Sequence, residues 1–202
     1  MIVNIIVAHC KNNGIGKNNT LLWNIKSDMA KFKKCTIGNN NNAIIMGKNT
    51  YISLNNKNGL SNRDNLILSK SLIIDKLHGK NIIKTFNNLD DINDFVKLKN
   101  YDEVWVIGGE QIYKLFLDNY KKEENSIYNI NEIIITYIDK EFDCDIFFPN
   151  LKKYTEKNNL YFYKKNIIKT ANLQYTLDLH NNNIKEQEDN NFNIYEIIYK
   201  YL

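Results

Sequence analysis

Residues 103–120 read EVWVIGGEQIYKLFLDNY, and the hydrophobic period changes in the middle of this stretch. Its first part is a continuous apolar run, which is typical of a strand buried on both faces. A helical segment follows the glycine pair Gly108–Gly109. A buried strand that runs through two glycines directly into a helix predicts one unit of a parallel β–α arrangement.

The same alternation continues on the N-terminal side of this stretch. Short runs rich in Ile and Val predict buried strands at residues 3–8, 43–47, 65–69 and 81–85. Longer segments with helical periodicity lie between some of them. Strands that alternate with helices predict an α/β fold with a mainly parallel central sheet and helices on both faces.

Two of these helices have recognisable first turns. The helix over 27–37 is expected to begin at a Ser27 cap, with helical spacing at Met29, Phe32 and Lys33. The helix over 88–100 has an acidic first turn, which the helix dipole favours. Its stripe consists of Leu89, Ile92, Phe95, Val96 and Lys99.

The pattern changes after residue 131, where strand-like segments predominate at 131–138, 160–170, 173–179 and 192–201. The last two are predicted to form a closing antiparallel hairpin around a long polar loop at 180–191. Segments 119–130 and 181–191 have the character of loop insertions. No linker or repeat divides the chain, so residues 1–202 are expected to form a single domain.

Composition excludes several functional classes. The net charge is +4 with no clustered basic block, which argues against a nucleic-acid partner. The three cysteines are widely spaced and follow no metal-ligand pattern, so we expect reduced thiols and no metal site. No apolar run has the length of a membrane span, and the N-terminus lacks the features of a signal peptide. We therefore expect a cytoplasmic monomer without a membrane partner.

Chemistry-bearing residues gather where predicted parallel strands end, which is where open α/β sheets bind ligands. Residues 6–28 combine a Gly-Ile-Gly loop with Trp23 and Asp28, and glycine is followed by Lys48 in 46–54. Each feature also has a simpler interpretation. Asp28 could be an acid in the first turn of a helix, where the helix dipole favours a negative charge. Trp23 could be part of the hydrophobic core, and a glycine pair could simply allow a strand and a helix to pack closely.

Together these stretches closely resemble the dihydrofolate reductase family. The similarity runs in order over residues 2–149 through "IVA…NGIGKN…LLW", "WNIKSDMAKFKKCT", "IIMGKNTYISL", "NRDNLILS", "VIGGEQIY", "TYID" and "CDIFFP". The closing "FNIYEIIYK" resembles the family's last strand. Several motifs at family spacing are much more specific than any one alone.

The resemblance implies reduction of 7,8-dihydrofolate to tetrahydrofolate by hydride from NADPH. Asp28 takes the position of the acid that binds the pterin and promotes protonation of N5 through water. Thr136 would hold that carboxylate and Trp23 would close over the water. By the same resemblance, the residues that bind the substrate are Ala8, Asp28, Phe32, Arg63, Ile107 and Tyr113.

The resemblance also implies a set of residues that bind NADPH. The loop containing Ile15 and Gly16 would close over the nicotinamide, which is docked by backbone at Ala8 and Ile15. Lys48, Asn49 and Thr50 match phosphate contacts, whereas Ser69 and Lys70 would receive the 2′-phosphate. The set is completed at the strand-to-helix junction by Gly108, Gly109, Glu110, Gln111 and Ile112, with the two glycines joined by a cis peptide in family members.

Arg63 is the only arginine among 27 lysines and arginines. The resemblance puts it where the family holds the α-carboxylate of the substrate's glutamate tail. A guanidinium donates two parallel hydrogen bonds to a carboxylate, which a lysine ammonium does not reproduce. This requirement would explain why a chain whose other basic residues are all lysine has an arginine at this position.

Three departures from the family pattern concern loops. Leu22 stands where proline is usual, Ser61 and Asn62 replace a common proline-glycine pair, and Ile146 replaces a threonine. These changes are expected to affect loop closure more than the type of reaction, since none touches Asp28 or Arg63.

Two other functions remain as alternatives. A riboflavin-pathway reductase shares the fold class but has no use for Trp23, Asp28, Phe32 and Arg63 as a pterin-glutamate site. A non-catalytic nucleotide- or RNA-binding protein of the same fold is the other alternative, against which the intact Asp28 and glycine sites argue. Some family members carry a thymidylate synthase on the same chain, whereas we expect this chain to be monofunctional.

Overall fold

A nine-stranded sheet dominates the computed structural model, which describes residues 2–122, 127–155, 160–171, 176–178, 183–185 and 192–201. The strand order is β10-β13-β8-β1-β7-β3-β4-β6-β5. The bounds are β1 Ile2–Cys10, β3 Ala43–Gly47, β4 Asp64–Leu68, β5 Asp75–His78, β6 Asn81–Phe86, β7 Glu103–Gly108, β8 Ile130–Ile138, β10 Leu160–Ala171 and β13 Phe192–Tyr201.

The centre of this sheet is parallel and its two edges are antiparallel. β1 pairs in parallel with β7 and β8, and the parallel pairing continues through β3, β4 and β6. β5 at one edge, and β13 with β10 at the other, run antiparallel to their neighbours. The predicted α/β fold with a mainly parallel sheet is therefore confirmed.

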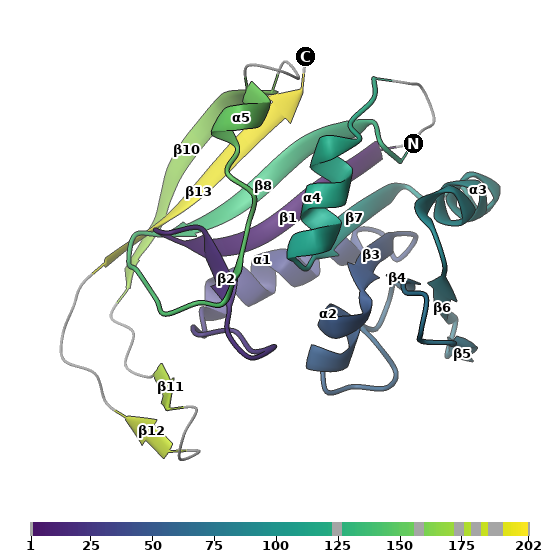
Figure 1. The fold of residues 1–202 in the computed structure, drawn as a ribbon, viewed down its shortest axis with the longest axis horizontal. Coiled ribbons are helices and arrows are strands. Elements are labelled where there is room, and N and C mark those ends of the chain that lie inside the picture. The colour runs from purple at the N-terminus through teal and green to yellow at the C-terminus, as the bar shows by residue number, and fades with distance from the viewer. Residues whose placement is uncertain are drawn as a thin grey trace.

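Helices cover both faces of the sheet (Figure 1). Their bounds are α1 Lys26–Ile37, α2 Lys48–Ser53, α3 Leu89–Lys99, α4 Glu110–Asp118 and α5 Lys152–Thr155. Buried residues of α3, α4 and α5 join one apolar cluster with alternate residues of the central strands. α1 and α2 pack on a second cluster, which contains Ile6, Trp105 and Ile134.

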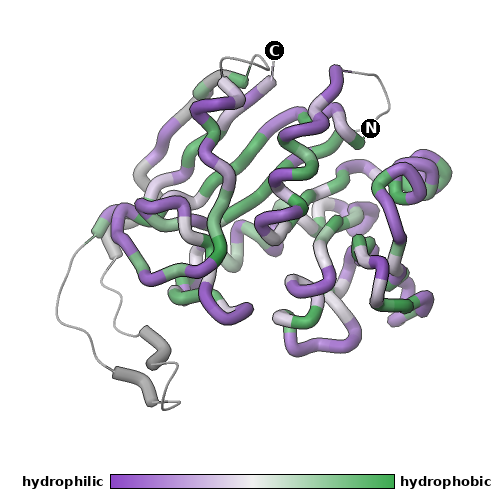
Figure 2. Tube along the Cα trace, viewed as in Figure 1, coloured by the Kyte–Doolittle hydropathy of each residue, from purple (hydrophilic) through white to green (hydrophobic). Residues whose placement is uncertain are grey.

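The apolar residues concentrate along the central strands, while the surrounding loops are hydrophilic (Figure 2). β3 and β4 consist mostly of buried residues, as expected for parallel strands covered by helices on both faces. The carboxyl ends of β1, β3, β4, β7 and β8 therefore come together on a rigid framework.

The start of α1 differs from the prediction, and its buried face includes charged residues. Ser27 lies inside the helix, and Ile25 takes the N-cap position without a side-chain hydrogen bond. Met29 and Lys33 are exposed. The inward face is instead formed by Asp28, Lys31, Phe32, Cys35 and Thr36. The predicted Ser27 cap was wrong because the helix already begins at Lys26, which gives Ser27 a helical backbone. Two of the inward residues, Asp28 and Lys31, are charged, which apolar periodicity would not select. By contrast, α3 begins as expected, with Asn88 Oδ1 accepting from Asp91 N at 2.8 Å.

The prediction for the closing hairpin gave the last strand, β13, the wrong partner strand. β13 pairs antiparallel with β10, not with the segment 173–179. Of that segment the structure describes β11, Thr176–Asp178, which pairs with β12, Asn183–Lys185, inside the predicted loop. Periodicity identified the strands but carried no information on their pairing, because each segment had an equally suitable apolar pattern. The predicted insertion at 119–130 includes residues 123–126, which lie outside the described part.

Asparagine occupies many of the backbone positions with positive φ, where other proteins often have glycine. The sequence has 36 asparagines and 8 glycines. Within the described ranges, every non-glycine residue with positive φ is asparagine, at positions 13, 18, 19, 40, 55, 62 and 100. Asparagine tolerates the left-handed region better than other side chains. Asn62, with φ of 62°, thus supplies the conformation that glycine would provide before Arg63.

Within the described ranges, no helix has the length and apolarity needed to cross a lipid bilayer. Besides β12, three short strands were not anticipated from the sequence. These are β5, β2 at Gly14–Gly16 and β9 at Ile146–Phe147, the last two of which pair with each other.

Candidate active site

Residues from distant parts of the chain meet where the parallel strands end. Ala8 of β1 lies directly opposite Thr136 of β8. In the other half of the sheet, Met46 of β3 lies opposite Gly108 of β7. α1 packs across β3 and β7. The predicted site residues therefore share one edge of the sheet, on both sides of β1 and β7.

Asp28 is a carboxylate withdrawn from solvent in the first turn of α1. It is 7% exposed, and its Oδ1 accepts a hydrogen bond of 2.6 Å from Thr136 Oγ1. Burial raises the pKa of Asp28, and the Thr136 hydrogen bond and the charge of Lys31 partly oppose that rise. A buried carboxyl group with a raised pKa close to the ends of parallel strands is a candidate for proton chemistry.

Trp23 supplies a buried donor near the start of the same helix. Its ring packs against Phe142 with centroids 5.4 Å apart. The indole Nε1 is buried and finds no acceptor within the described part of the chain. Because leaving a buried N–H unpaired costs free energy, this donor is suited to an acceptor brought by solvent or ligand.

Arg63 is the second buried charge. Its side chain is 3% exposed; Nε donates to the Ser61 carbonyl oxygen at 2.9 Å and Nη1 donates to Thr36 Oγ1. Burial lowers the pKa of Arg63 to about 10, which still leaves it cationic at neutral pH. No ion pair joins Arg63 to a carboxylate of the described residues. The positive charge of Arg63 is thus not neutralised by these residues, and an anionic ligand is a suitable partner for it.

The inward face of α1 sets the spacing between these charges. Asp28, Phe32 and Thr36 follow one another at intervals of four residues, and Thr36 contacts Arg63. Eight residues of α-helix span about 12 Å. The Phe32 ring lies between, with the Arg63 guanidinium carbon 5.9 Å from its centroid. This geometry suits an elongated ligand with a hydrogen-bonding ring at one end and a carboxylate at the other.

The strand-to-helix junction after β7 is closely packed. Gly108 and Gly109 are joined by a cis peptide bond, and Gly108 has φ of 107°. A Cβ on Gly108 would lie 2.7 Å from the Tyr113 ring, and one on Gly109 would lie 3.4 Å from Thr50 Oγ1. Tyr113 is buried and donates to the Ile6 carbonyl oxygen at 2.9 Å. Glycines here leave backbone accessible to a ligand at the N-terminus of α4.

Polar groups that follow β3 and β4 form a neighbouring subsite. Lys48 Nζ donates to Ser71 Oγ at 2.9 Å. Ser69 Oγ accepts from the backbone N–H groups of Ser71 at 3.2 Å and Leu72 at 3.0 Å. Lys70 and Asn49 are exposed beside them, while Thr50 is half-buried. This arrangement brings two lysines and several hydroxyl groups to adjacent strand ends, as a phosphate site requires.

The Gly-Ile-Gly loop is docked on residues 143–147. Gly14–Gly16 pairs with Ile146–Phe147, and a Cβ on Gly14 would collide with Cys144 Sγ. Lys17 and Asp143 form an ion pair, and Asn18 N donates to Asp145 Oδ2 at 3.0 Å. Ile15 itself is buried. The loop is therefore held at the edge of the site despite the departures at Leu22 and Ile146.

The remaining predicted residues lie at the end of β7 and on α4. Ile107 is half-buried at the end of β7, and Ile112 packs on Gly47 of β3. Glu110 Oε2 accepts from Phe147 N at 3.4 Å, which links α4 to the docked loop. Gln111 is exposed on α4.

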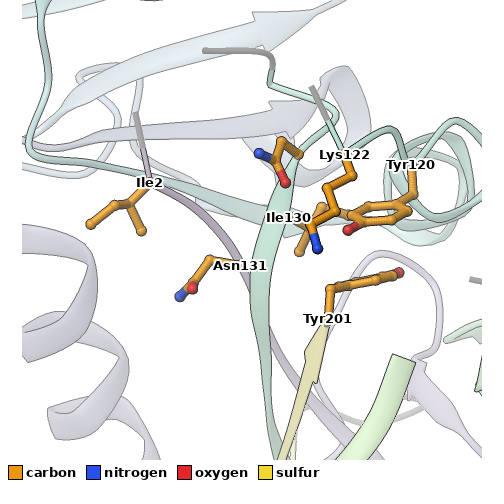
Figure 3. Close-up of a pocket in the computed structure, with 7 residues that line it drawn as sticks. Ile2, Tyr120, Lys122, Ile130, Asn131 and Tyr201 are labelled. Carbon is orange, nitrogen blue, oxygen red and sulfur yellow. The ribbon is translucent and has the colours of Figure 1, made fainter. Parts of the chain in front are cut away.

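A separate pocket of about 220 Å³ lies beside the amino ends of β1 and β8. Figure 3 shows the residues that line it. Its lining includes Ile2, Asn131 and the stacked rings of Tyr120 and Tyr201. None of the predicted site residues lines it, and it is remote from the carboxyl ends of the parallel strands. It is therefore not the candidate active site.

Comparison with known proteins identifies the family. The dihydrofolate reductase family model matches residues 2–181. A dihydrofolate reductase of Heliothis virescens is 33% identical over 157 residues, covering 75% of this chain and 80% of the relative. A viral dihydrofolate reductase of Saimiriine herpesvirus 2 (strain 488) is 35% identical over 168 residues, covering 76% and 72%. The enzyme of Schistosoma mansoni is 33% identical over 159 residues, covering 75% and 80%.

The chain belongs to the dihydrofolate reductase family. The resemblance inferred from its motifs is therefore confirmed.

Sequence reasoning missed three polar residues of this family member's site. Thr36 and Ser71 contact Arg63 and Lys48, respectively. Lys31 lies inward on α1, one turn after Asp28. The i, i+3 spacing from Asp28 could have identified Lys31, whereas the partners of Arg63 and Lys48 depend on tertiary contacts that the local pattern does not contain.

Proposed function

We propose that this protein reduces 7,8-dihydrofolate to tetrahydrofolate, with NADPH as the hydride donor. One observation carries the proposal. A buried carboxylate and a buried guanidinium, Asp28 and Arg63, flank the Phe32 ring along one helix face. Dihydrofolate presents groups that match them in order, namely an amino-pyrimidinone ring, an aromatic linker and a glutamate carboxylate. Family membership supports the same substrate.

Asp28 and Arg63 would bind the two ends of this substrate. The Asp28 carboxylate accepts hydrogen bonds from the pterin 2-amino group and N3, while Arg63 donates a pair of hydrogen bonds to the tail carboxylate. Phe32 packs against the rings between them. Ala8, Ile107 and Tyr113 complete the walls at the ends of β1 and β7 and on α4.

Proton transfer would depend on Asp28, Thr136 and Trp23. The reduced C6–N5 bond of the pterin requires a proton at N5. Asp28 promotes this protonation through water, while Thr136 orients the carboxylate by donating to Oδ1. The unpaired Trp23 Nε1 donates to the same water and limits solvent access.

The residues present fit NADPH. Glycines with little room for a Cβ line the strand-to-helix junctions after β3 and β7, and two lysines stand at adjacent strand ends. Lys48, Asn49, Thr50 and the Gly108–Ile112 segment would hold the phosphates, Ser69 and Lys70 the 2′-phosphate, and Ala8, Ile15 and Gly16 the nicotinamide. When bound, NADPH supplies the hydride that the pterin accepts at C6.

A riboflavin-pathway reductase or a non-catalytic binding protein is not favoured. Neither function would require Arg63 to be buried beside Phe32 without a carboxylate partner in the described part of the chain. We also infer that residues 1–202 act as one domain, and that the protein works as a cytoplasmic monomer on small molecules.

Turnover tests the proposed function directly. Addition of 7,8-dihydrofolate to the protein and NADPH is expected to cause loss of NADPH absorbance with equimolar formation of tetrahydrofolate. A folded protein that binds NADPH and dihydrofolate without turnover would overturn the proposal in favour of a binding role.

Substitution of the two lysines distinguishes the phosphates they bind. Lys70→Gln is expected to raise KM for NADPH about two- to fivefold and to leave KM for NADH unchanged, because the exposed Lys70 would contact only the 2′-phosphate. Lys48→Met is expected to raise KM for both cofactors about tenfold. Lys97→Gln, on an exposed position of α3, is the control. Equal effects of Lys70→Gln on both cofactors would contradict the assignment.

A further inference from the structure

Lys31 is an unusual residue for the inward face of α1. It follows Asp28 by three residues and precedes the half-buried Cys35, so all three lie on the side of the helix that faces the sheet. Its side chain is 21% exposed and Nζ is shielded from solvent. A lysine usually keeps its ammonium group in water, and one that turns inward requires a compensating charge.

Glu196 of β13 provides part of that compensation. Glu196 Oε2 forms an ion pair with Lys31 Nζ, and its side chain is 22% exposed. Asn166 Nδ2 of β10 donates to Glu196 Oε1 at 3.1 Å and so orients the carboxylate. Glu196 is therefore held at two oxygens, one by a cation and one by an amide.

The sheet register connects this ion pair to the active site. Glu196 lies directly opposite Thr136 in the antiparallel pairing of β13 with β8. Directly opposite residues project from the same face, with Cβ atoms about 5 Å apart. Thr136 in turn donates to Asp28 Oδ1. Lys31 thus reaches Glu196 immediately beside the Asp28–Thr136 hydrogen bond.

We propose that Lys31 and Glu196 are positioning residues that set the proton affinity of Asp28. Lys31 stabilises the ionised carboxylate of Asp28 by its charge. Glu196 holds the ammonium group in place and cancels part of its field. The two residues therefore act on Asp28 in opposite directions, and their balance determines how readily Asp28 takes up a proton.

The other groups around Asp28 are neutral or paired elsewhere, so Lys31 and Glu196 are the main charges that act on it. Thr136 from β8 is neutral, as are Trp23 from the preceding loop and Ala8 from β1. Tyr113 from α4 is buried with its hydroxyl bonded to Ile6, and burial raises its pKa, so it stays neutral. Among the acids on this face, Glu132 pairs with Lys200 at 3.8 Å and Glu103 accepts from Trp105 Nε1 at 3.1 Å. Both belong to the amino-terminal half of their strands.

The proposal rests on the proposed function for its kinetic readout only. The titration of Asp28 can be followed in the ligand-free protein by carboxyl ¹³C NMR, independently of turnover. Absence of turnover in the wild type would therefore refute the proposed function and leave the titration to decide this inference. Conversely, normal turnover with no change in titration would refute the inference alone.

The test compares Lys31→Met, Lys31→Arg and Glu196→Gln. Lys31→Met is expected to move the Asp28 midpoint upward by about half a pH unit or more, and Glu196→Gln is expected to move it downward. Lys31→Arg keeps the charge and should restore the wild-type midpoint. The limb of the kcat/KM profile with dihydrofolate that reports Asp28 is expected to follow each shift.

Lys33→Met is the matched control, since Lys33 is exposed on the same helix. It should leave both the midpoint and the pH profile unchanged. Shifts of the same sign in Lys31→Met and Glu196→Gln, or no shift in either, would overturn the proposal. A merely structural role for the ion pair would lower thermal stability in both variants without producing opposite shifts.

Discussion

Asp28→Asn is expected to lower kcat for dihydrofolate reduction by roughly two to three orders of magnitude at neutral pH while the protein stays folded. An amide at this position retains the size of the side chain but carries no negative charge and has no proton to exchange. It also presents an N–H₂ group where the carboxylate would accept from the pterin, so KM should rise as well. Steady-state kinetics between acidic and neutral pH measures both effects.

The pH dependence of the variant follows from the same chemistry. With Asp28 absent, N5 must take its proton from solvent, so the residual rate of Asp28→Asn should increase as the pH falls. Asp91→Asn removes an exposed acid from the first turn of α3 and should keep the wild-type profile. An Asp28→Asn variant with unchanged activity from acidic to neutral pH would contradict the role given to Asp28.

Stability should respond to Asp28→Asn in the opposite sense to activity. Burial raises the pKa of Asp28, so the folded protein favours the protonated carboxyl group. The corresponding free energy of unfolding is fully present below the ordinary pKa of the group and is lost as pH rises through the raised value. Asparagine does not suffer this loss. The ligand-free variant should therefore unfold at a higher temperature than the wild type at neutral pH.

The parallel strands of the sheet could be predicted from the sequence, but the pairing of β10 with β13 at its antiparallel edge could not. Buried parallel strands such as 43–47 and 103–108 are continuous apolar runs bounded by glycine, and this local signal is strong. The partner of β13 is set by long-range pairing, which periodicity does not encode. For that reason 160–170 was recognised as a strand while its pairing with 192–201 was missed.

The residues of the candidate site could be predicted where the local sequence requires one particular residue type. A glycine pair at a strand end and an acid at a helix start are local features, and family spacing connected them. The inward lysine was missed because amphipathic patterns assign charged residues to the solvent side. Lys31 violates that rule together with Asp28 on the same face, and such violations are expected at functional sites.

Arg63→Lys is expected to raise KM for dihydrofolate about 10- to 100-fold with a much smaller change in kcat. A charge-assisted pair of hydrogen bonds to a carboxylate contributes about 1.5–3 kcal/mol, and the lysine ammonium would not reproduce its geometry. The contact is about 12 Å along α1 from Asp28, so it should be equally strong in the ground state and the transition state. Loss of such uniform binding appears in KM.

A substrate without the glutamate tail separates ligand binding from structure at Arg63. Arg63 also donates to Thr36 and to the Ser61 carbonyl oxygen, so the variant should lose some thermal stability whatever its effect on catalysis. A 7,8-dihydropterin that lacks the tail carboxylate has nothing for the guanidinium to bind. Wild type and Arg63→Lys should therefore reduce it with nearly equal kcat/KM, while their values for dihydrofolate differ by the full factor. An equal loss with both substrates would show instead that this chain keeps its single arginine to hold the turn before β4 against α1.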